Sequence, residues 1–348
     1  MDKHDGKYYL QYACTGAQYN VYADGVYVSD SPLGPFKLAQ NNPYSYKPGG
    51  FIPGAGHGST MRDQNDNLWH TSTMRISMNH NFERRVGVWP AGFDADGELF
   101  CNQRYGDWPQ AVSGDKQDPW KNPEWMLLSY GKNATASSAE EGKGADKVTE
   151  ENVRTWWRAA SEKPGEWVQV DLGETMDVHA IQVNFADDKI EIPTPGELRG
   201  NQTGKRYIED KSEVTTNLPH DLVVREDGMQ VRFLKLTVLE VPYDQKACIS
   251  GLRVFGKGNG QAPKTPTFAA KREADRRYMK VTIESPSDDV VGYNILWGHK
   301  ADKLYHSYMV FGVTEKEIKA LVTTQNYFVR VDAFNENGIT EGQVIALA

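Results

Sequence analysis

Apolar and polar residues alternate strictly in several short stretches of this chain, most clearly in Trp167-Val168-Gln169-Val170-Asp171-Leu172-Gly173. Side chains of a β-strand point in turn to the two faces of its sheet, so a period of two residues predicts strands with one buried face. Comparable strand-like runs occupy Tyr8–Tyr12, Gly25–Ser29, Leu68–Met74, Val86–Pro90, Val178–Phe185, Val231–Leu239, Ile249–Phe255, Tyr278–Glu284, Gly292–Gly298, Tyr305–Val310 and Asn326–Phe334. Because no long helical pattern interrupts them, the sequence predicts an all-β protein.

Turn signals separate these runs. The chain has 32 Gly and 17 Pro beside 17 Tyr, 12 Phe and 9 Trp, a combination typical of short strands joined by turns. Asp-Gly pairs at 5–6, 24–25 and 96–97 each predict a turn. The three cysteines, Cys14, Cys101 and Cys248, are too widely spaced for a CxxC metal site, and we interpret them as small buried hydrophobic residues.

Charge and hydropathy exclude several classes of function. The net charge is −8 and basic residues are not concentrated in one segment, which disfavours nucleic-acid binding. No stretch of about 18 apolar residues predicts a membrane span, and the first residues lack the pattern of a signal peptide. The sequence also lacks a P-loop, a GxGxxG fingerprint, a nucleophile elbow and an HExxH motif.

The length of 348 residues predicts two to three domains. The Gly- and Pro-rich junction Lys257-Gly258-Asn259-Gly260-Gln261-Ala262-Pro263 predicts a short linker, and two prolines near Asp118–Pro123 mark an earlier boundary. We therefore expect domains at 1–127, 128–258 and 259–348. Residues 186–220 are polar and interrupted by Pro and Gly, which predicts a long loop.

The last two regions resemble known β-sandwich families. Residues 259–348 resemble a fibronectin type III module, through Gly292–Gly298 and through Tyr327-Phe328-Val329-Arg330-Val331-Asp332-Ala333-Phe334-Asn335-Glu336-Asn337-Gly338. Residues 128–258 resemble a discoidin (F5/8 type C) module of the galactose-binding-like fold. The residues that carry this second resemblance are Ala145–Lys147, Thr155–Trp157, Trp167–Gly173, Val231–Leu236 and Ile249–Gly256.

The first region, residues 1–127, resembles the C-terminal part of a glycoside hydrolase family 43 five-bladed β-propeller. The resemblance rests on Lys7–Tyr12, Gly25–Phe36, Gly54-Ala55-Gly56-His57-Gly58-Ser59 and Asn67–His70. It implies a partial propeller of the last two blades, with the first three blades upstream of this chain. The expected architecture is thus this partial propeller followed by two β-sandwiches.

Glycosidic bond hydrolysis in this family uses an Asp base, a second Asp and a Glu acid. The resemblance places all three before Met1, and near the start of the chain only Asp2 and Asp5 are carboxylates. We therefore identify no catalytic residue in this chain. An inverting mechanism needs two carboxyl groups about 6.5–9.5 Å apart, which upstream blades would supply.

Three propeller residues are candidates for the axis or the substrate side. The resemblance places His57 at the propeller axis, near a bound cation or its waters, whereas the residues alone also fit a hydrogen-bonded structural histidine. It places a substrate-facing arginine near Arg84 and Arg85, with Arg84 matching the spacing better; the alternative is a solvated surface arginine. Arg75 is a weaker candidate for that arginine, and His70 is interpreted as a packing residue.

The discoidin-like region offers two further candidates. Adjacent Trp156 and Trp157 point to opposite faces of an extended segment, so Trp157 is expected in the core and Trp156 outside. Trp156 then either stacks on a sugar or covers a loop. The resemblance requires no cofactor but allows a structural Ca²⁺, at Glu150, Asn152 and Thr155 or at the propeller axis; Gly251 stands where the family often has a Glu ligand.

These observations leave three hypotheses of function. In the first, the chain belongs to an exported arabinosidase- or xylosidase-like glycoside hydrolase, located outside the cell or in the periplasm, whose partners are an oligo- or polysaccharide and its own upstream blades. In the second, it is a non-catalytic protein that binds a glycan through the discoidin-like region. In the third, the appended modules are purely structural.

Overall fold

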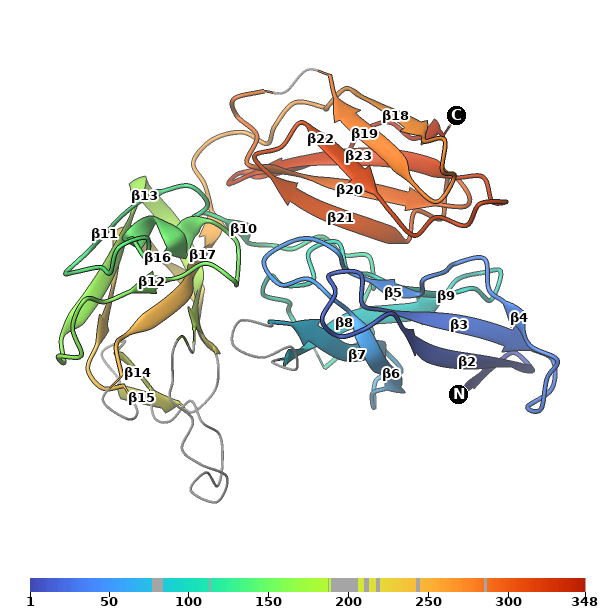
Figure 1. Cartoon of the computed structure of the whole chain (residues 1–348), viewed down its shortest axis with the longest axis horizontal. Helices are drawn as coiled ribbons and strands as arrows, with labels where there is room; N and C mark the ends of the chain where they lie inside the picture. The colour runs from blue at the N-terminus through green and yellow to red at the C-terminus, as the bar shows by residue number, and fades with distance from the viewer. Residues whose placement is uncertain are drawn as a thin grey trace. The chain divides into compact units, whose positions relative to one another are not determined.

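The computed structural model describes residues 1–76, 84–112, 114–186, 188, 206–209, 213–216, 220–241, 245–284 and 287–347. These residues form an all-β structure whose one helical segment among them is the short 3₁₀-helix η1 (Ala145–Thr149) (Figure 1). The chain divides into two compact units. The first combines the N-terminal part through Pro123 with Gln261–Ala348, and the second comprises Glu124–Gly260. Within the described residues, no helix is long and apolar enough to cross a membrane.

The first unit begins with two antiparallel sheets. One contains β1 (Asp2–His4), β2 (Lys7–Cys14), β3 (Ala23–Ser29), β4 (Lys37–Leu38) and β5 (Ser45–Tyr46). The other has the order β6 (Gly56–Arg62), β7 (Leu68–Arg75), β8 (Arg84–Phe93) and β9 (Leu99–Cys101). Large side chains such as Trp89 and Tyr46 are buried here. The four strand-like runs predicted in this region all lie within strands of these sheets.

One predicted turn in this region is wrong. Asp24 and Gly25 lie inside β3, paired with Ala13 and Tyr12 of β2. Asp24 is buried and accepts hydrogen bonds from distant residues, so its carboxylate is satisfied inside a sheet and not in a turn. A Cβ added at Gly25 would lie 2.4 Å from the ring of Tyr12, so a larger residue would displace that ring. Asp-Gly pairs at 5–6 and 96–97 do lie outside the strands, in turns.

The C-terminal part of the first unit is a sandwich of two sheets (Figure 1). One sheet has the order β18 (Phe268–Arg272), β19 (Met279–Ile283) and β22 (Glu315–Ile318). The other contains β21 (His306–Phe311), β20 (Gly292–Gly298), β23 (Phe328–Asn335), β24 (Gly338–Thr340) and β25 (Ile345–Ala346). Trp297 is buried in the core between them, as predicted, and Tyr327 is buried with its hydroxyl accepting a hydrogen bond from the Val322 amide at 3.0 Å.

This sandwich packs on the N-terminal sheets through an ion cluster. The ammonium of Lys303 lies 2.6 Å from Asp94, 2.7 Å from Asp96 and 3.2 Å from Glu98, all in or beside the turn between β8 and β9. The Tyr305 hydroxyl donates a 2.7 Å hydrogen bond to Asp94. These contacts join parts of the chain about two hundred residues apart.

Aromatic rings extend the same contact. Trp120 stacks on Tyr305 with ring centroids 5.3 Å apart and lies 4.7 Å from Phe100. The imidazole of His306 is buried and hydrogen-bonds the carbonyl of Pro43 at 2.8 Å. Burial lowers the pKa of His306 to about 4, so this imidazole is neutral at pH 7.

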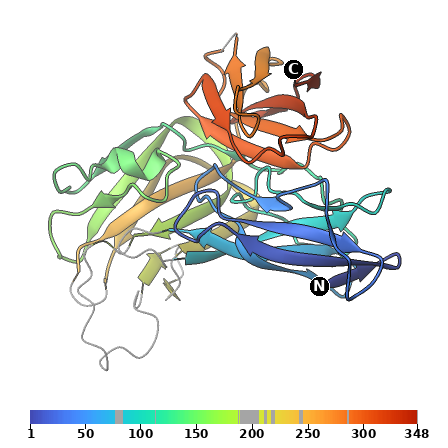
Figure 2. The ribbon, with the colours of Figure 1, turned by 45° about the vertical axis from the view of Figure 1, so that its right-hand side comes forward.

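The second unit is built on one long bent strand, β13 (Glu166–Phe185), which pairs with three others (Figure 2). These are β11 (Asn133–Ala136), β16 (His220–Val238) and β17 (Cys248–Lys257). Strand β17 also pairs with β10 (Met126–Leu127) and β12 (Trp157–Arg158). The core contains Trp157, as predicted, with Val168, Val170, Leu172 and Val254.

Two expectations for this unit need adjustment. The alternating run does not end at Gly173: β13 continues through an irregularity between Asp171 and Met176, where Gly173 has φ +90°. Two predicted strands are therefore one, because a glycine accommodates the bend without ending the pairing. Of the expected loop 186–220, the described residues include the hairpin of β14 (Arg206–Glu209) and β15 (Glu213–Thr216), and most of the remainder lies outside the described residues.

The cysteines are free thiols: Cys101 and Cys248 are buried, and Cys14 is half-buried. Burial raises the pKa of the Cys101 thiol well above its ordinary value, which keeps it protonated and unreactive at neutral pH.

Candidate functional site

The candidate residues of the propeller-like region lie at one end of the sheet β6–β9. The register pairs Gly56 with Thr73 and Arg75 with Arg84, so the start of β6, the end of β7 and the start of β8 lie at the same end. His57 follows Gly56, and Arg85 follows Arg84. The structure thus places His57, Arg84, Arg85 and Arg75 at one end of one sheet.

A buried carboxylate holds the backbone at this end. Asp24 accepts hydrogen bonds from the amides of His57 at 2.7 Å and Gly58 at 2.8 Å. Its Oδ2 also lies 3.1 Å from Nε2 of His70, a fully buried imidazole whose Nδ1 is 3.1 Å from the hydroxyl of Thr60. Since two backbone donors and one imidazole converge on one carboxylate, the entry to β6 is fixed from within the protein.

His57 itself is strained and exposed. Its φ is +58°, a conformation that non-glycine residues adopt rarely and that often marks a functional constraint. The glycines beside it permit close contacts: a Cβ on Gly56 would lie 2.6 Å from the Tyr22 ring, and one on Gly58 would lie 2.4 Å from the carbonyl of Thr71. The backbone is therefore held tightly while the imidazole faces outward.

The arginines differ in exposure. Arg84 is exposed and Arg85 is half-buried, and as neighbours in β8 their side chains point to opposite faces. Burial raises the pKa of the Tyr22 hydroxyl, and the positive charge of Arg84 opposes that shift, so the guanidinium acts close to Tyr22. Arg75 donates a hydrogen bond to the side chain of Asn20.

Sequence reasoning missed Asp24 and the role of His70. Asp24 was hidden by its following glycine, since an Asp-Gly pair is the usual sign of a hairpin turn. His70 does pack, 6.4 Å from Trp89 between ring centroids, but it also hydrogen-bonds the buried Asp24. A charge in a run that otherwise alternates as a strand is the one signal that would have pointed to Asp24.

The two N-terminal carboxylates have local roles. Asp2 accepts a 2.6 Å hydrogen bond from the side-chain amide of Gln11, and Asp5 lies in the exposed turn after β1 with φ +46°. No catalytic pair was predicted among them, and we assign none.

In the second unit, Trp156 is half-buried and lies among charged groups. Its indole N–H donates a 3.0 Å hydrogen bond to Asp188, and the ammonium of Lys143 lies 3.3 Å from a ring centroid. Arg158, from β12, lies 4.0 Å from Asp188 and 3.1 Å from Glu140, and Lys246 lies 2.7 Å from Glu140. An aromatic ring bordered by donors and acceptors is chemistry that suits a sugar.

The predicted Ca²⁺ ligands are each engaged locally. Glu150 lies 2.5 Å from the ammonium of Lys147, Asn152 Oδ1 accepts from the Arg154 amide, and the Thr155 hydroxyl donates to the Asn152 carbonyl. Hydrogen bonds to Glu150 and Asp146 raise the pKa of Lys147, so an ammonium occupies the place beside Glu150. These contacts occupy the three side chains locally, and Ca²⁺ binding here or at the propeller axis stays a prediction.

The neighbouring Glu151 has a different partner. Its carboxylate forms a two-point ion pair with the guanidinium of Arg253 in β17, at 2.9 Å from Nε and 2.8 Å from Nη2. Both side chains are buried, at 0% exposure for Arg253 and 1% for Glu151. This ion pair attaches the loop that contains Glu150, Asn152 and Thr155 to the central sheet of the second unit.

Comparison with protein families supports the resemblances in two regions. Residues 1–99 match the profile of glycosyl hydrolases family 43. Residues 133–255 match the profile of the F5/8 type C domain. Together these matches support a carbohydrate-processing protein that carries an F5/8 type C domain. The search of curated proteins finds no match.

The comparison with solved structures finds several similar chains. One, a protein described as a glycoside hydrolase, is 17% identical, with a TM-score of 0.38, over 73% of this chain and 58% of its own. The family 32 carbohydrate-binding module of C. perfringens NanJ, solved with galactose, is 19% identical, with a TM-score of 0.29, over 38% of this chain and 98% of its own. This chain thus spans little more than half the length of that glycoside hydrolase.

Proposed function

We propose that this chain is part of a longer, exported glycoside hydrolase that acts on arabinose- or xylose-containing glycans. Propeller blades that precede these residues would supply the catalytic acid and base, and the end of β6–β9 with His57 and Arg84 would face the substrate. The match of residues 1–99 to family 43 supports this proposal. Residues 1–127, 128–258 and 259–348 would then be the propeller part, the discoidin-type domain and a fibronectin type III-like domain.

The observation that carries the proposal is an uncovered apolar sheet face. Val86 and Val88 of β8 are 74% and 43% exposed, and Met61 of β6 is 51% exposed, whereas Trp89 on the opposite face of β8 is fully buried. Exposed apolar side chains that gather on one face usually mark a contact surface. A further blade packed against this face would bury them.

The C-terminal sandwich gives a second, smaller support. A buried tyrosine whose hydroxyl bonds a backbone group a few residues upstream occurs in immunoglobulin-like sandwiches. Tyr327, bonded to the amide of Val322, is such a residue. This supports the fibronectin type III-like proposal for residues 259–348.

The first prediction concerns the adjacent arginines. In the longer protein with its preceding blades, Arg84→Ala is expected to lower kcat/KM on 4-nitrophenyl arabinofuranoside or xyloside about tenfold or more, because a guanidinium contact to the substrate is lost. Arg85→Ala is the matched control, since its side chain points to the other face of β8. If the longer protein hydrolyses neither glycoside, the proposed activity is wrong.

A second candidate function, glycan binding without catalysis, is favoured by the surroundings of Trp156. Trp156→Ala is expected to weaken binding of this chain on a glycan array about tenfold or more, since stacking on the ring is lost, while Trp167→Ala serves as the control for a half-buried tryptophan elsewhere in the unit. Unchanged binding after Trp156→Ala would contradict this assignment. Binding in a protein whose longer form shows no hydrolysis would favour this second function.

A further inference from the structure

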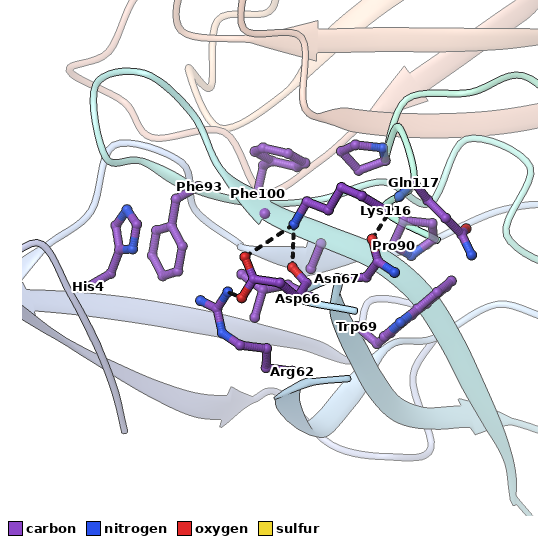
Figure 3. A pocket seen from close by; sticks show the side chains of 14 residues that line it. His4, Arg62, Asp66, Asn67, Trp69, Pro90, Phe93, Phe100, Lys116 and Gln117 are labelled. Carbon is purple, nitrogen blue, oxygen red and sulfur yellow. Dashed lines mark hydrogen bonds and ion pairs between the residues drawn. The ribbon is translucent and has the colours of Figure 1, made fainter. Parts of the chain in front are cut away.

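A pocket of about 290 Å³ lies at the other end of the sheet β6–β9, away from His57 and Arg84 (Figure 3). Arg62 ends β6 and pairs with Leu68 at the start of β7, so the turn between these strands forms one wall. Six residues of an antiparallel strand extend about 17–20 Å, which makes this pocket a separate place on the sheet. Its volume is at the lower end for ligand sites, which suits one small ligand or the end of a longer one.

One wall of the pocket is aromatic. The rings of His4 and Phe93 stack with centroids 3.8 Å apart and an interplanar angle of 7°, and the rings of Phe100 and Trp69 also line the pocket (Figure 3). The Trp69 N–H donates to Asp63 at 2.9 Å, which orients the indole. The apolar part of the pocket therefore combines these rings with Leu68, Pro90, Ala91 and Pro119.

A polar wall, with donors and acceptors side by side, lies between the His4–Phe93 pair and Trp69 (Figure 3). Asp66 pairs with Arg62 and lies 3.6 Å from the ammonium of Lys116 (Figure 3). Asn67, which is buried, accepts a hydrogen bond from the Gln117 amide at 2.8 Å and donates to the Asp115 carbonyl at 2.9 Å. These bonds hold the 115–117 segment against the turn, so the wall is formed before any ligand arrives.

The two positive side chains of this wall, Arg62 and Lys116, are both paired with the carboxylate of Asp66. An anionic ligand would have to compete with Asp66 for these cations. A neutral ligand rich in hydroxyls gains more, because each hydroxyl both donates to a carboxylate and accepts from an ammonium or guanidinium.

We propose that this pocket binds one neutral saccharide residue, with its hydroxyls on Asp66 and Lys116 and its C–H face against the His4–Phe93 wall. The site would be additional to the discoidin-type domain and to the end of the sheet that carries His57. It would hold a second part of a glycan on the same sheet. The assignment of a neutral saccharide rests on the lining of the pocket. The choice of a pentose, such as xylose, rests on the proposed function.

Hydrogen–deuterium exchange of the full chain with xylotriose tests the proposal, because it locates protection along the sequence. Peptides over 62–69 and 114–119 are expected to gain protection. Asp66→Gly should reduce the affinity about tenfold, since the carboxylate is lost. It should leave the melting temperature unchanged, because Asp66 has φ +65°, which glycine adopts without strain. Lys116→Ala should also reduce the affinity about tenfold. Lys264→Ala, at an exposed position outside the pocket, should leave the affinity unchanged.

The possible outcomes separate this site from the proposed function. Protection that persists in Trp156→Ala but is lost in Asp66→Gly supports the pocket. Protection only within residues 124–260 overturns it, leaving glycan binding by the discoidin-type domain intact. Stronger protection of 62–69 by glucuronate than by xylotriose overturns the assignment of a neutral ligand. Absence of protection at 62–69 with xylose, galactose and xylotriose overturns the site, whatever the hydrolytic activity of the longer protein.

Discussion

Glu151→Gln is expected to lower the free energy of unfolding of residues 124–260 by about 3–5 kcal/mol. The variant leaves the guanidinium of Arg253, which has 0% exposure, facing a neutral amide. Removing one charge of a buried pair costs more than the pair contributes as a whole, because the remaining charge has lost its water without a compensating partner. The measurement is amide exchange in β17 or denaturant unfolding of the chain.

Two control variants test whether the loss comes from the buried charge. Asp171→Asn breaks the pair of Asp171 with Arg232, whose side chain is 47% exposed, and should cost at most about 1 kcal/mol. The double variant Glu151→Leu with Arg253→Met removes both buried charges and should recover most of the loss. A loss below about 1 kcal/mol for Glu151→Gln would show that the pair is not held as described.

Lys303→Met is expected to destabilise the first unit by about 3 kcal/mol, because it leaves Asp94, Asp96 and Glu98 without their shared ammonium. The side chain of Lys303 is 7% exposed. Lys300→Met is the matched control, since Lys300 pairs with Asp96 but is 51% exposed and should contribute at most about 1 kcal/mol. Denaturant unfolding followed by tryptophan fluorescence measures both.

The same cluster predicts a dependence on pH. Burial opposes ionisation of Asp94, but hydrogen bonds from Lys303, Glu98 and Tyr305 lower its pKa, and bonds from Lys303 and Lys300 lower the pKa of Asp96 to about 2. Both carboxylates thus stabilise the fold above their ordinary pKa of 3.8, and this contribution is lost as the pH falls through their folded values. The difference between Lys303→Met and the parent chain should therefore shrink below about pH 4.

Deprotonation of Lys303 sets the upper pH limit of the stabilisation by this cluster. Burial lowers the pKa of its ammonium, but the hydrogen bonds to Asp94, Asp96 and Glu98 outweigh it and raise the pKa above the ordinary 10.5. Its contribution is complete below pH 10.5 and is lost as the pH rises through the folded value. An equal difference between variant and parent at pH 3 and pH 7 would contradict this account.

Strand positions were accessible from the sequence because alternation is a local signal. Gly292–Gly298 was predicted as a strand and is β20, with the same bounds. Long-range features were not accessible, since nothing near Lys303 in the sequence indicates a turn at Asp94 some two hundred residues earlier. Gly173 and Gly25 were misread for one reason: a glycine that relieves a steric contact or a bend looks, in sequence, like one that ends a strand.

The candidate site was predicted only in part. His57, Arg84 and Arg85 were singled out through a resemblance, and the register of β6–β8 places them at one end of a sheet. Asp24, which orients the backbone of His57, was not foreseen because its partners are more than thirty residues away. The pocket beside Asp66 could not be foreseen either, since its walls come from five separate segments.

The first unit is discontinuous in the chain, with residues 124–260 inserted between its two parts. During synthesis, Asp94 and Glu98 therefore leave the ribosome about two hundred residues before Lys303 does. The contacts between Lys303 and these carboxylates therefore cannot form until residues 124–260 have been synthesised. The first unit thus acquires its complete set of contacts only when both of its parts have been made.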